Sequence, residues 1–330
     1  MRLFHTGTIV TLLSLAFCAS SLAQSPAFSK LVVFGDSISD TGNLAFIDLP
    51  PPYFENRISN GPVAVDFIAA SIDSNADASR HLFGQASGFN YAVSGGNAVG
   101  SDPEDLSQQV SAFLMRTDQQ ADIDALYVII IGGNDLRSIR SITDPATASV
   151  SIDTVIAQVE SQINRLIDAG ARAFLVANVA NIGRIPETQA LNLGQPSIAF
   201  RAEQYVREYN LALSPVLANF SQRSDVSLVE FDLFQALENV LDNASNFGFT
   251  NIEEGCFDPG DFSVETECLI FGFDSRVFFD NIHPSAATNR LIAPLIVGAI
   301  PQLPEPTPEP EVDPPAVIIS PILDLLLKQN

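Results

Sequence analysis

Apolar runs recur along the chain and are separated by stretches in which apolar residues return with a helical period. The runs are rich in Val, Ile, Leu and Phe and carry little charge, a pattern typical of strands buried on both faces of a sheet. They cover residues 31–34, 89–93, 126–131, 173–179 and 226–231. The sequence therefore predicts a buried sheet at the centre of the fold.

The stretches between these runs predict helices. Their apolar residues recur at three- and four-residue spacing, which places them on one helical face. The expected helices cover residues 61–72, 106–114, 152–169, 197–220, 233–241 and 285–297. Strands that alternate with helices indicate an α/β fold, in which a parallel sheet is joined by right-handed crossovers.

Residues 247–279 break this alternation. The segment is rich in Gly, Phe and Asp and holds Cys256 and Cys268. Loops of this length are usually functional or disordered. We expect a long surface excursion that returns to the edge of the sheet.

The two ends of the chain differ from the part between them. Arg2, a short apolar run over residues 9–19 and a small-x-small site ending at Ala23 predict a signal peptide, residues 1–23. Residues 24–300 would then form one domain, and residues 301–330 a Pro/Glu-rich tail with a short apolar end. Both terminal apolar runs are too short to span a bilayer. The mature protein is therefore expected to be secreted, extracellular or periplasmic, without an integral membrane segment.

Charge and cysteine content narrow the possible functions. Acidic residues outnumber basic ones 39 to 16, giving a net charge of −23, which repels phosphate backbones and argues against nucleic acid as a partner. Without the signal peptide two cysteines remain, Cys256 and Cys268, and an exported chain with such a pair is expected to form a disulfide. No metal-binding or phosphate-loop motif occurs, so we expect neither a metal nor a cofactor.

Polar groups follow three of the predicted strands. Ser37 comes after Gly35 and Asp36, Gly95 follows the second run, and Asn134 follows the third. Because the carboxyl ends of parallel strands meet at one edge of a sheet, these groups should line one crevice. A hydroxyl, a glycine amide and a carboxamide are the groups that acyl transfer requires.

A serine nucleophile also needs a base. After the signal peptide the chain has two histidines, His81 and His283. His81 lies in a polar loop and is interpreted as a solvated residue. His283 stands three residues after Asp280, so one short segment can supply both a base and the carboxylate that orients it.

Four blocks, taken together and in this order, resemble the GDSL esterases and lipases of the SGNH-hydrolase superfamily. They are FGDSISDTGN at residues 34–43, NYAVSG at 90–95, GGND at 132–135 and DNIHP at 280–284. The resemblance extends from about Lys30 to about Val297. It implies a flavodoxin-like three-layer α/β/α sandwich with a central parallel sheet of about five strands.

The resemblance also implies roles for individual residues. Ser37 would be the nucleophile, His283 the base and Asp280 its orienting partner. The oxyanion hole would consist of the Ser37 amide, the Gly95 amide and the Asn134 side chain. Gly96 is adjacent to Gly95, so its amide remains the alternative donor.

The expected activity is that of a secreted serine ester hydrolase that acts through an acyl-enzyme on small-molecule or lipid esters. Within the family the chain resembles the bacterial exported lipase, phospholipase and acyltransferase branch. An acyltransferase and a carbohydrate O-deacetylase are the alternatives on the same site, and a non-catalytic binding protein is the least favoured. The phenylalanines of residues 247–279 would either line an acyl-chain site or anchor that segment on the core.

Overall fold

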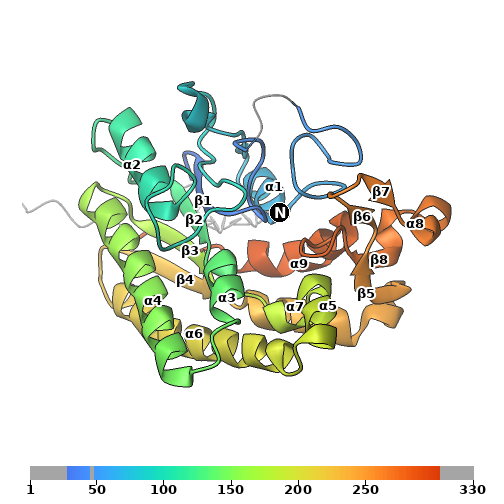
Figure 1. The fold of residues 1–330 in the computed structure, drawn as a ribbon. Coiled ribbons are helices and arrows are strands. Elements are labelled where there is room, and N and C mark those ends of the chain that lie inside the picture. Colours follow the sequence, from blue (N-terminus) through green and yellow to red (C-terminus); the bar gives the residue numbers. More distant parts are fainter. Residues whose placement is uncertain (1–27, 45–47, 305–330) are drawn as a thin grey trace, which may run out of the picture.

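The computed structural model describes residues 28–44 and 48–304. The predicted signal peptide and most of the predicted tail therefore lie outside the described residues. The described chain forms three layers, with a parallel sheet between two groups of helices (Figure 1). This confirms the predicted α/β class.

The central sheet has the order β1-β2-β3-β4, and each neighbouring pair is parallel. Every residue of the first three strands is buried, because helices cover both faces. The strands are β1 (Leu31–Gly35), β2 (Leu126–Ile130), β3 (Ala173–Ala177) and β4 (Ser227–Phe231).

The sheet has four regular strands among the described residues, and residues 89–93 take the place of the expected fifth. They run parallel to β1, and the Tyr91 amide donates to the Val33 carbonyl at 2.7 Å. Only an isolated bridge forms, between Val33 and Asn90. Beyond Val33 the Gly35 amide donates to the Gln109 side chain at 2.9 Å, and this bond interrupts the regular ladder.

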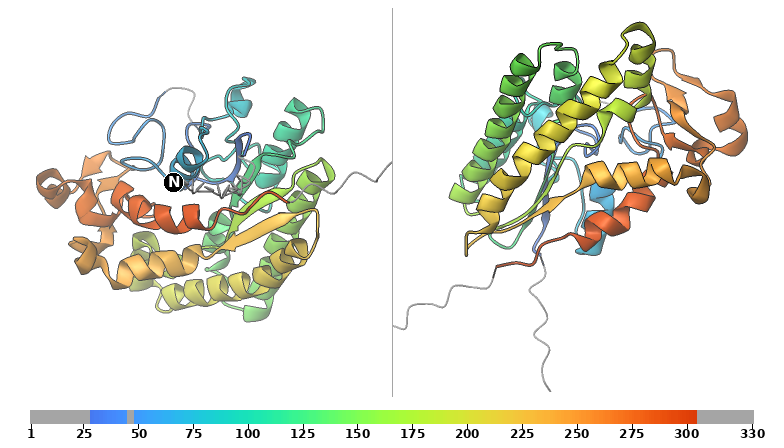
Figure 2. Two further views of the ribbon diagram at one scale, coloured as in Figure 1. Left: turned by 180° about the vertical axis from the view of Figure 1, so that it is seen from behind. Right: turned by 90° about the horizontal axis from the view of Figure 1, so that it is seen from below.

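Two sets of helices cover the sheet (Figure 2). On one face lie α1 (Ala64–Ser71), α7 (Leu233–Asp242) and α9 (Ala286–Gly298). On the other lie α2 (Leu106–Arg116), α4 (Pro145–Asp168) and α6 (Ile198–Ser221). The helix α4 begins earlier than predicted, because Asp144 caps it by accepting the Thr147 amide and Pro145 fits its first turn.

The sequence did not predict several short elements. These are α3 (Gly133–Ile139), α5 (Pro186–Gly194) and the 3-10 turns η1 (His81–Phe83), η2 (Ile182–Arg184), η3 (Ala244–Phe247) and η4 (Phe273–Ser275). Gly132 follows β2 with φ +110°, and α3 begins at the next residue. As a result Asn134 lies in the first turn of a helix.

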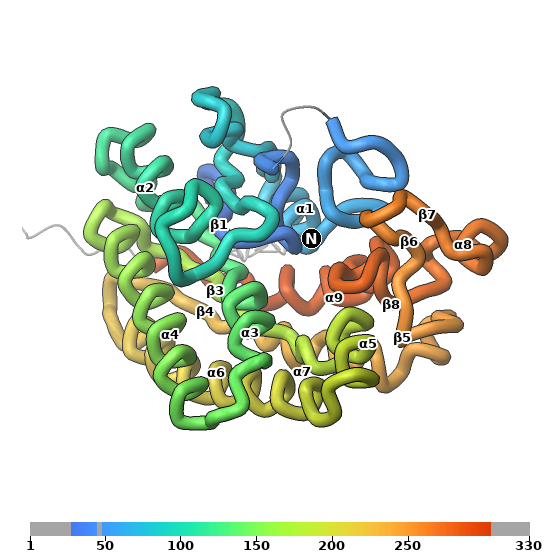
Figure 3. The backbone as a smooth tube through the Cα atoms, in the orientation of Figure 1, coloured from blue at the N-terminus to red at the C-terminus, as the bar shows by residue number. Residues whose placement is uncertain are grey.

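Residues 251–279 are here called the disulfide arm (Figure 3). The expectation that this excursion returns to the edge of the central sheet is wrong. The arm contains β5 (Asn251–Gly255), β6 (Phe257–Asp258), β7 (Ser263–Val264), α8 (Thr266–Phe271) and β8 (Arg276–Phe278). It does not return to the edge of the central sheet, because β8 pairs with β5 and β6 pairs with β7. Cys256 and Cys268 are joined by a disulfide.

Across residues 28–44 and 48–304, none of the helices is long and apolar enough to span a membrane.

Candidate active site

Ser37 lies in the turn that ends β1. The Gln109 side chain accepts the Gly35 amide at 2.9 Å and donates to the Gly35 carbonyl at 2.7 Å, so it occupies the strand's hydrogen bonds at that point. A Cβ on Gly35 would lie 2.3 Å from the Ile130 carbonyl oxygen, so only glycine fits here. The chain then turns, and the Asp36 carbonyl accepts the amides of Ser39 and Asp40.

Ser37, His283 and Asp280 form a continuous chain of hydrogen bonds. The Ser37 Oγ lies 2.7 Å from His283 Nε2, and His283 Nδ1 lies 2.8 Å and 2.9 Å from the two oxygens of Asp280. A carboxylate facing Nδ1 places the ring proton on that nitrogen, so Nε2 of the neutral ring accepts from the Ser37 hydroxyl.

The environment of Asp280 favours its charged form. Burial acts to raise the pKa of this carboxyl, but the neighbouring His283 and the amides of Ile282 and His283, both at 2.8 Å, hold the pKa below its usual value. The carboxylate is therefore ionised over the pH range in which an imidazole changes charge.

The turn after residues 89–93 presents a backbone amide near this chain. The Gly96 amide donates to the Val93 carbonyl at 3.0 Å, whereas the Gly95 and Ser37 amides have no hydrogen-bond partner among the described residues. Gly95 has φ +89°, a conformation that favours glycine. Of the two neighbouring glycines, Gly95 thus keeps its N–H available for a ligand.

Asp40 connects these two turns and was not singled out from the sequence. One of its oxygens accepts the amides of Gly42 and Asn43, both at 2.7 Å. The other accepts the amide of Ser94 at 2.8 Å and its hydroxyl at 3.0 Å. Its position in the Asp-Thr-Gly-Asn turn was the available signal, since Asp commonly accepts amides two and three residues ahead.

The interpretation of His81 as a solvated loop residue is wrong. The residue is half-buried, its Nδ1 lies 2.7 Å from the Ser79 hydroxyl, and its ring packs against Tyr91. Burial lowers the pKa of His81 to about 4. The residue is therefore a packed, neutral side chain and not a solvated one.

Asp36, next to Ser37, is buried and accepts the Ile38 amide at 3.1 Å. Burial raises its pKa from 3.8 to about 6. The unfolded chain therefore ionises Asp36 first, and the folded state loses stability as the pH rises between these two values. At 1.36 kcal/mol per unit the loss is about 3 kcal/mol.

An Asp36→Asn variant should lack this titration. Its Tm relative to the wild type is expected to rise as the pH is increased from about 4 to about 8. Thermal melts of both proteins across that range measure the difference. A difference that does not change with pH would contradict the buried, perturbed Asp36.

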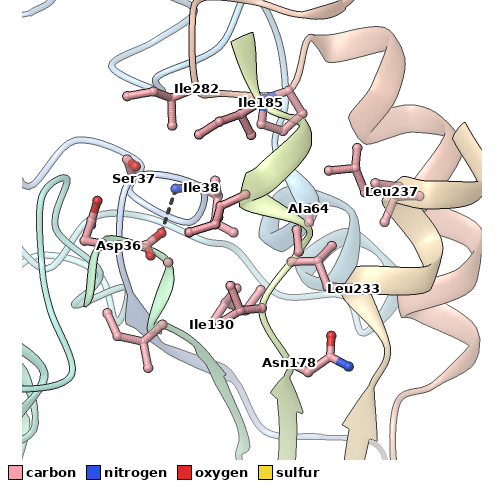
Figure 4. A pocket seen from close by; sticks show the side chains of 18 of the residues that line it. Asp36, Ser37, Ile38, Ala64, Ile130, Asn178, Ile185, Leu233, Leu237 and Ile282 are labelled. Atoms are coloured by element: carbon pink, nitrogen blue, oxygen red, sulfur yellow. Dashed lines mark hydrogen bonds between the residues drawn. The ribbon is translucent and has the colours of Figure 1, made fainter. Parts of the chain in front are cut away.

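An apolar pocket opens beside Ser37 (Figure 4). It extends among the sheet, α1, α7 and α9. Aliphatic side chains form most of its wall, among them Ile38, Ala64, Ile130, Leu233, Leu237 and Ile292. Phe278 is the one phenylalanine of residues 247–279 that lines it, so most aromatic residues of that segment lie elsewhere.

Three other phenylalanines of the disulfide arm pack on one another, whereas Phe262 and Phe271 are exposed. Phe257 stacks on Phe279 and contacts Tyr53, and Phe273 also packs against Phe279. The arm also touches the Asp280 segment, because a Cβ on Gly255 would lie 2.3 Å from the Asp280 carbonyl. These aromatic residues therefore anchor the arm beside the site, as one of the two interpretations of the sequence had it.

Among residues 28–44 and 48–304, no three His, Cys, Asp or Glu side chains lie together in a way that could hold a metal ion. The polar groups around Ser37 are instead hydrogen-bonded to one another and to the backbone.

The family model and the curated relatives that match this chain name the same family. The family model described as GDSL-like Lipase/Acylhydrolase matches residues 31–296. A GDSL esterase/lipase of Arabidopsis thaliana is 27% identical, covering 83% of this chain and 88% of its own. The phosphatidylcholine-sterol acyltransferase of Aeromonas hydrophila is also 27% identical, covering 75% and 71% respectively.

The chain is also similar to a relative named as inactive and to a solved structure. A protein of Arabidopsis thaliana named an inactive GDSL esterase/lipase-like protein is 25% identical over 91% of this chain and 77% of its own. Among solved structures, a catalytic mutant of an acetylxylan esterase from Geobacillus stearothermophilus covers 83% of this chain and 97% of its own, at 13% identity and a TM-score of 0.46.

Proposed function

Since the chain belongs to the GDSL-like lipase/acylhydrolase family and is a serine ester hydrolase, we propose that Ser37 is its nucleophile, His283 its base and Asp280 the orienting carboxylate. The observation that carries this assignment is the hydrogen-bond chain from Ser37 Oγ through His283 to Asp280. Such a chain activates a hydroxyl that is otherwise a weak nucleophile.

The reaction would proceed in two halves. His283 takes the proton of the Ser37 hydroxyl as the oxygen attacks the ester carbonyl, and then gives this proton to the departing alcohol. Water then attacks the acyl-enzyme as His283 takes its proton, and His283 returns that proton to Ser37 Oγ when the bond between the acyl group and Oγ breaks and the acid leaves. In both halves the amides of Ser37 and Gly95 and the Asn134 carboxamide would donate to the oxyanion.

We also propose that the substrate carries an extended apolar acyl group. Pockets lined mainly by aliphatic side chains bind apolar ligands, and this pocket opens beside Ser37. An acetyl group would leave most of its aliphatic wall without contact, so an O-deacetylase is less favoured.

Rates with p-nitrophenyl esters from acetyl to palmitoyl test this proposal. Ala64 lines the pocket, and Figure 4 shows it between Ser37 and Leu237. An Ala64→Leu variant should lower kcat/KM for the longer esters about tenfold or more while sparing the acetyl ester, since each buried CH₂ contributes about 0.8 kcal/mol. Ala70→Leu, on an exposed position of α1, is the matched control. An equal loss on all esters would contradict the assignment of the pocket.

Transfer of the acyl group to an alcohol is the second candidate. The specific observation that favours it is the relative named phosphatidylcholine-sterol acyltransferase. Both activities share the acyl-enzyme and differ in whether water or an alcohol attacks it. Adding a long-chain alcohol to the ester assay and measuring the new ester separates them.

We further propose that the protein is exported. The N-terminal signal pattern and the disulfide between Cys256 and Cys268 support this, because structural disulfides persist in oxidising compartments. Fractionation of cells that express the full chain would test it.

A further inference from the structure

The carboxamide of Asn134 is held at both ends. Its Nδ2 donates to the Gly96 carbonyl at 2.9 Å, and its Oδ1 accepts from Nη1 of Arg137 at 2.9 Å. Asn134 and Arg137 lie three residues apart on α3, so they share one face of the helix. An acceptor on one side and a cationic donor on the other define which end of the amide carries the N–H groups.

Arg137 is in turn held by Glu187 of α5. Its Nε and Nη2 donate to the two Glu187 oxygens at 3.1 Å and 2.5 Å, which is the bidentate geometry that suits a guanidinium. Arg140 also binds Glu187, with 2.7 Å between Nη2 and Oε2. Burial acts to raise the pKa of Glu187, but these two arginines hold it below its usual value.

The charges of this group do not cancel. Two guanidinium groups face one carboxylate, so Arg137 keeps a positive charge beside the Asn134 amide that Glu187 alone does not neutralise, with the buried Asp36 also within its electrostatic range. Arg137 and Glu187 are 25% and 28% exposed, so solvent screens this charge less than it would on the open surface. Arg137 also lines the pocket, and its charge acts to lower the pKa of Asp36 beside Ser37.

Glu187 also joins the group to the His283 segment. Its backbone amide donates to the Asn281 carbonyl at 2.9 Å, one residue after Asp280. The start of α5 therefore contacts both the side chain that holds Asn134 and the segment that carries the base.

On this geometry we propose that Arg137 is a positioning residue, which orients and polarises the Asn134 carboxamide for the oxyanion, and that Glu187 holds it in place. This inference rests on the proposed function. A cation at the amide oxygen draws electron density from the nitrogen, so the Asn134 N–H becomes a stronger donor. The effect is greatest in the transition state, when the carbonyl oxygen becomes negative.

The other role open to an arginine in a pocket is binding an anionic group of the substrate. Three nitrogens of Arg137 already donate, one to Asn134 and two to Glu187. A guanidinium has five N–H groups, so one on Nη1 and one on Nη2 have no partner among the described residues. An uncharged ester therefore has to be used in the test, because with it the only contact of Arg137 relevant to the proposal is the one to Asn134.

A double-mutant cycle tests the proposal with an uncharged p-nitrophenyl ester. Arg137→Met should lower kcat about tenfold with KM nearly unchanged, and Arg137→Lys should restore part of the loss because it keeps the charge and a donor. In an Asn134→Ala background, Arg137→Met should change kcat by less than about twofold, because the residue through which it acts is gone.

The outcomes separate this inference from the proposed function. Arg223→Met, which removes an exposed arginine paired with Asp225, is the matched control and should keep full activity. An Arg137→Met loss that persists in the Asn134→Ala background, or a change confined to KM, would overturn the inference. Turnover by a Ser37→Ala variant would instead overturn the proposed function.

Glu187→Gln keeps the test usable if Arg137→Met fails to fold, as a thermal melt would reveal. This variant leaves Arg137 in place and weakens its anchor, so kcat should fall severalfold and the fall should again vanish in the Asn134→Ala background. Equal falls in both backgrounds would overturn the inference.

Discussion

Replacing Ser37 with alanine should lower kcat on every p-nitrophenyl ester by about a millionfold, the loss expected when the nucleophile of such a triad is removed. The fold should persist, since the hydrogen bond of the Ser37 hydroxyl goes to His283 at the edge of the pocket. Initial rates of the purified variant, with a thermal melt on the same sample, measure both effects.

Ser39 provides a closely matched control. It lies two residues away in the same turn, and its hydroxyl is buried without a hydrogen-bond partner among the described residues. Ser39→Ala should therefore keep the activity and lose little or no stability. Comparable activity in Ser37→Ala and Ser39→Ala would disprove the assignment of the nucleophile.

Replacing His283 with alanine should cost about as much as replacing Ser37, because neither group works without the other. The double variant Ser37→Ala/His283→Ala should be no slower than either single variant. This lack of additivity is the diagnostic result, and single-turnover rates on one ester measure it.

His81 is the control for the loss of a histidine. It packs against Tyr91 and bonds Ser79, away from the Ser37 hydroxyl. His81→Ala should keep the rate per folded molecule. Additive losses in the Ser37/His283 double variant would show that the two residues do not act as one unit.

Much of the fold could be predicted from the sequence, because an apolar run or a helical spacing of apolar residues involves only a short stretch of the chain. The strands β1 to β4 and the long helices α4 and α6 followed from such windows. The irregular pairing of residues 89–93 with β1 did not, because it depends on the Gln109 side chain, which binds Gly35 from 74 residues away. The inner pairing of β5 with β8 depends on contacts 25 residues apart, between Asn251 and Arg276, and no local pattern reports them.

The candidate site, too, could be predicted only in part from the sequence. Ser37, Asp280 and His283 were proposed from motif order, and the structure brings them within hydrogen-bond distance. Gly95 was preferred to Gly96 from the sequence, but the bond of the Gly96 amide to the Val93 carbonyl, which leaves the Gly95 amide available, is seen only in three dimensions. The wall of the pocket could not be predicted, because its side chains come from α1, α7 and α9, which are far apart in the sequence.

The bond between Ser37 and His283 joins positions 246 residues apart. A ribosome that adds about 5–20 residues per second needs roughly 12 to 50 s to travel from one codon to the other. Throughout that interval the nascent chain holds a serine, the turn around it and Asp40, but no base. On the proposed assignment, any translation product that stops short of position 283 lacks the base and should not cleave esters.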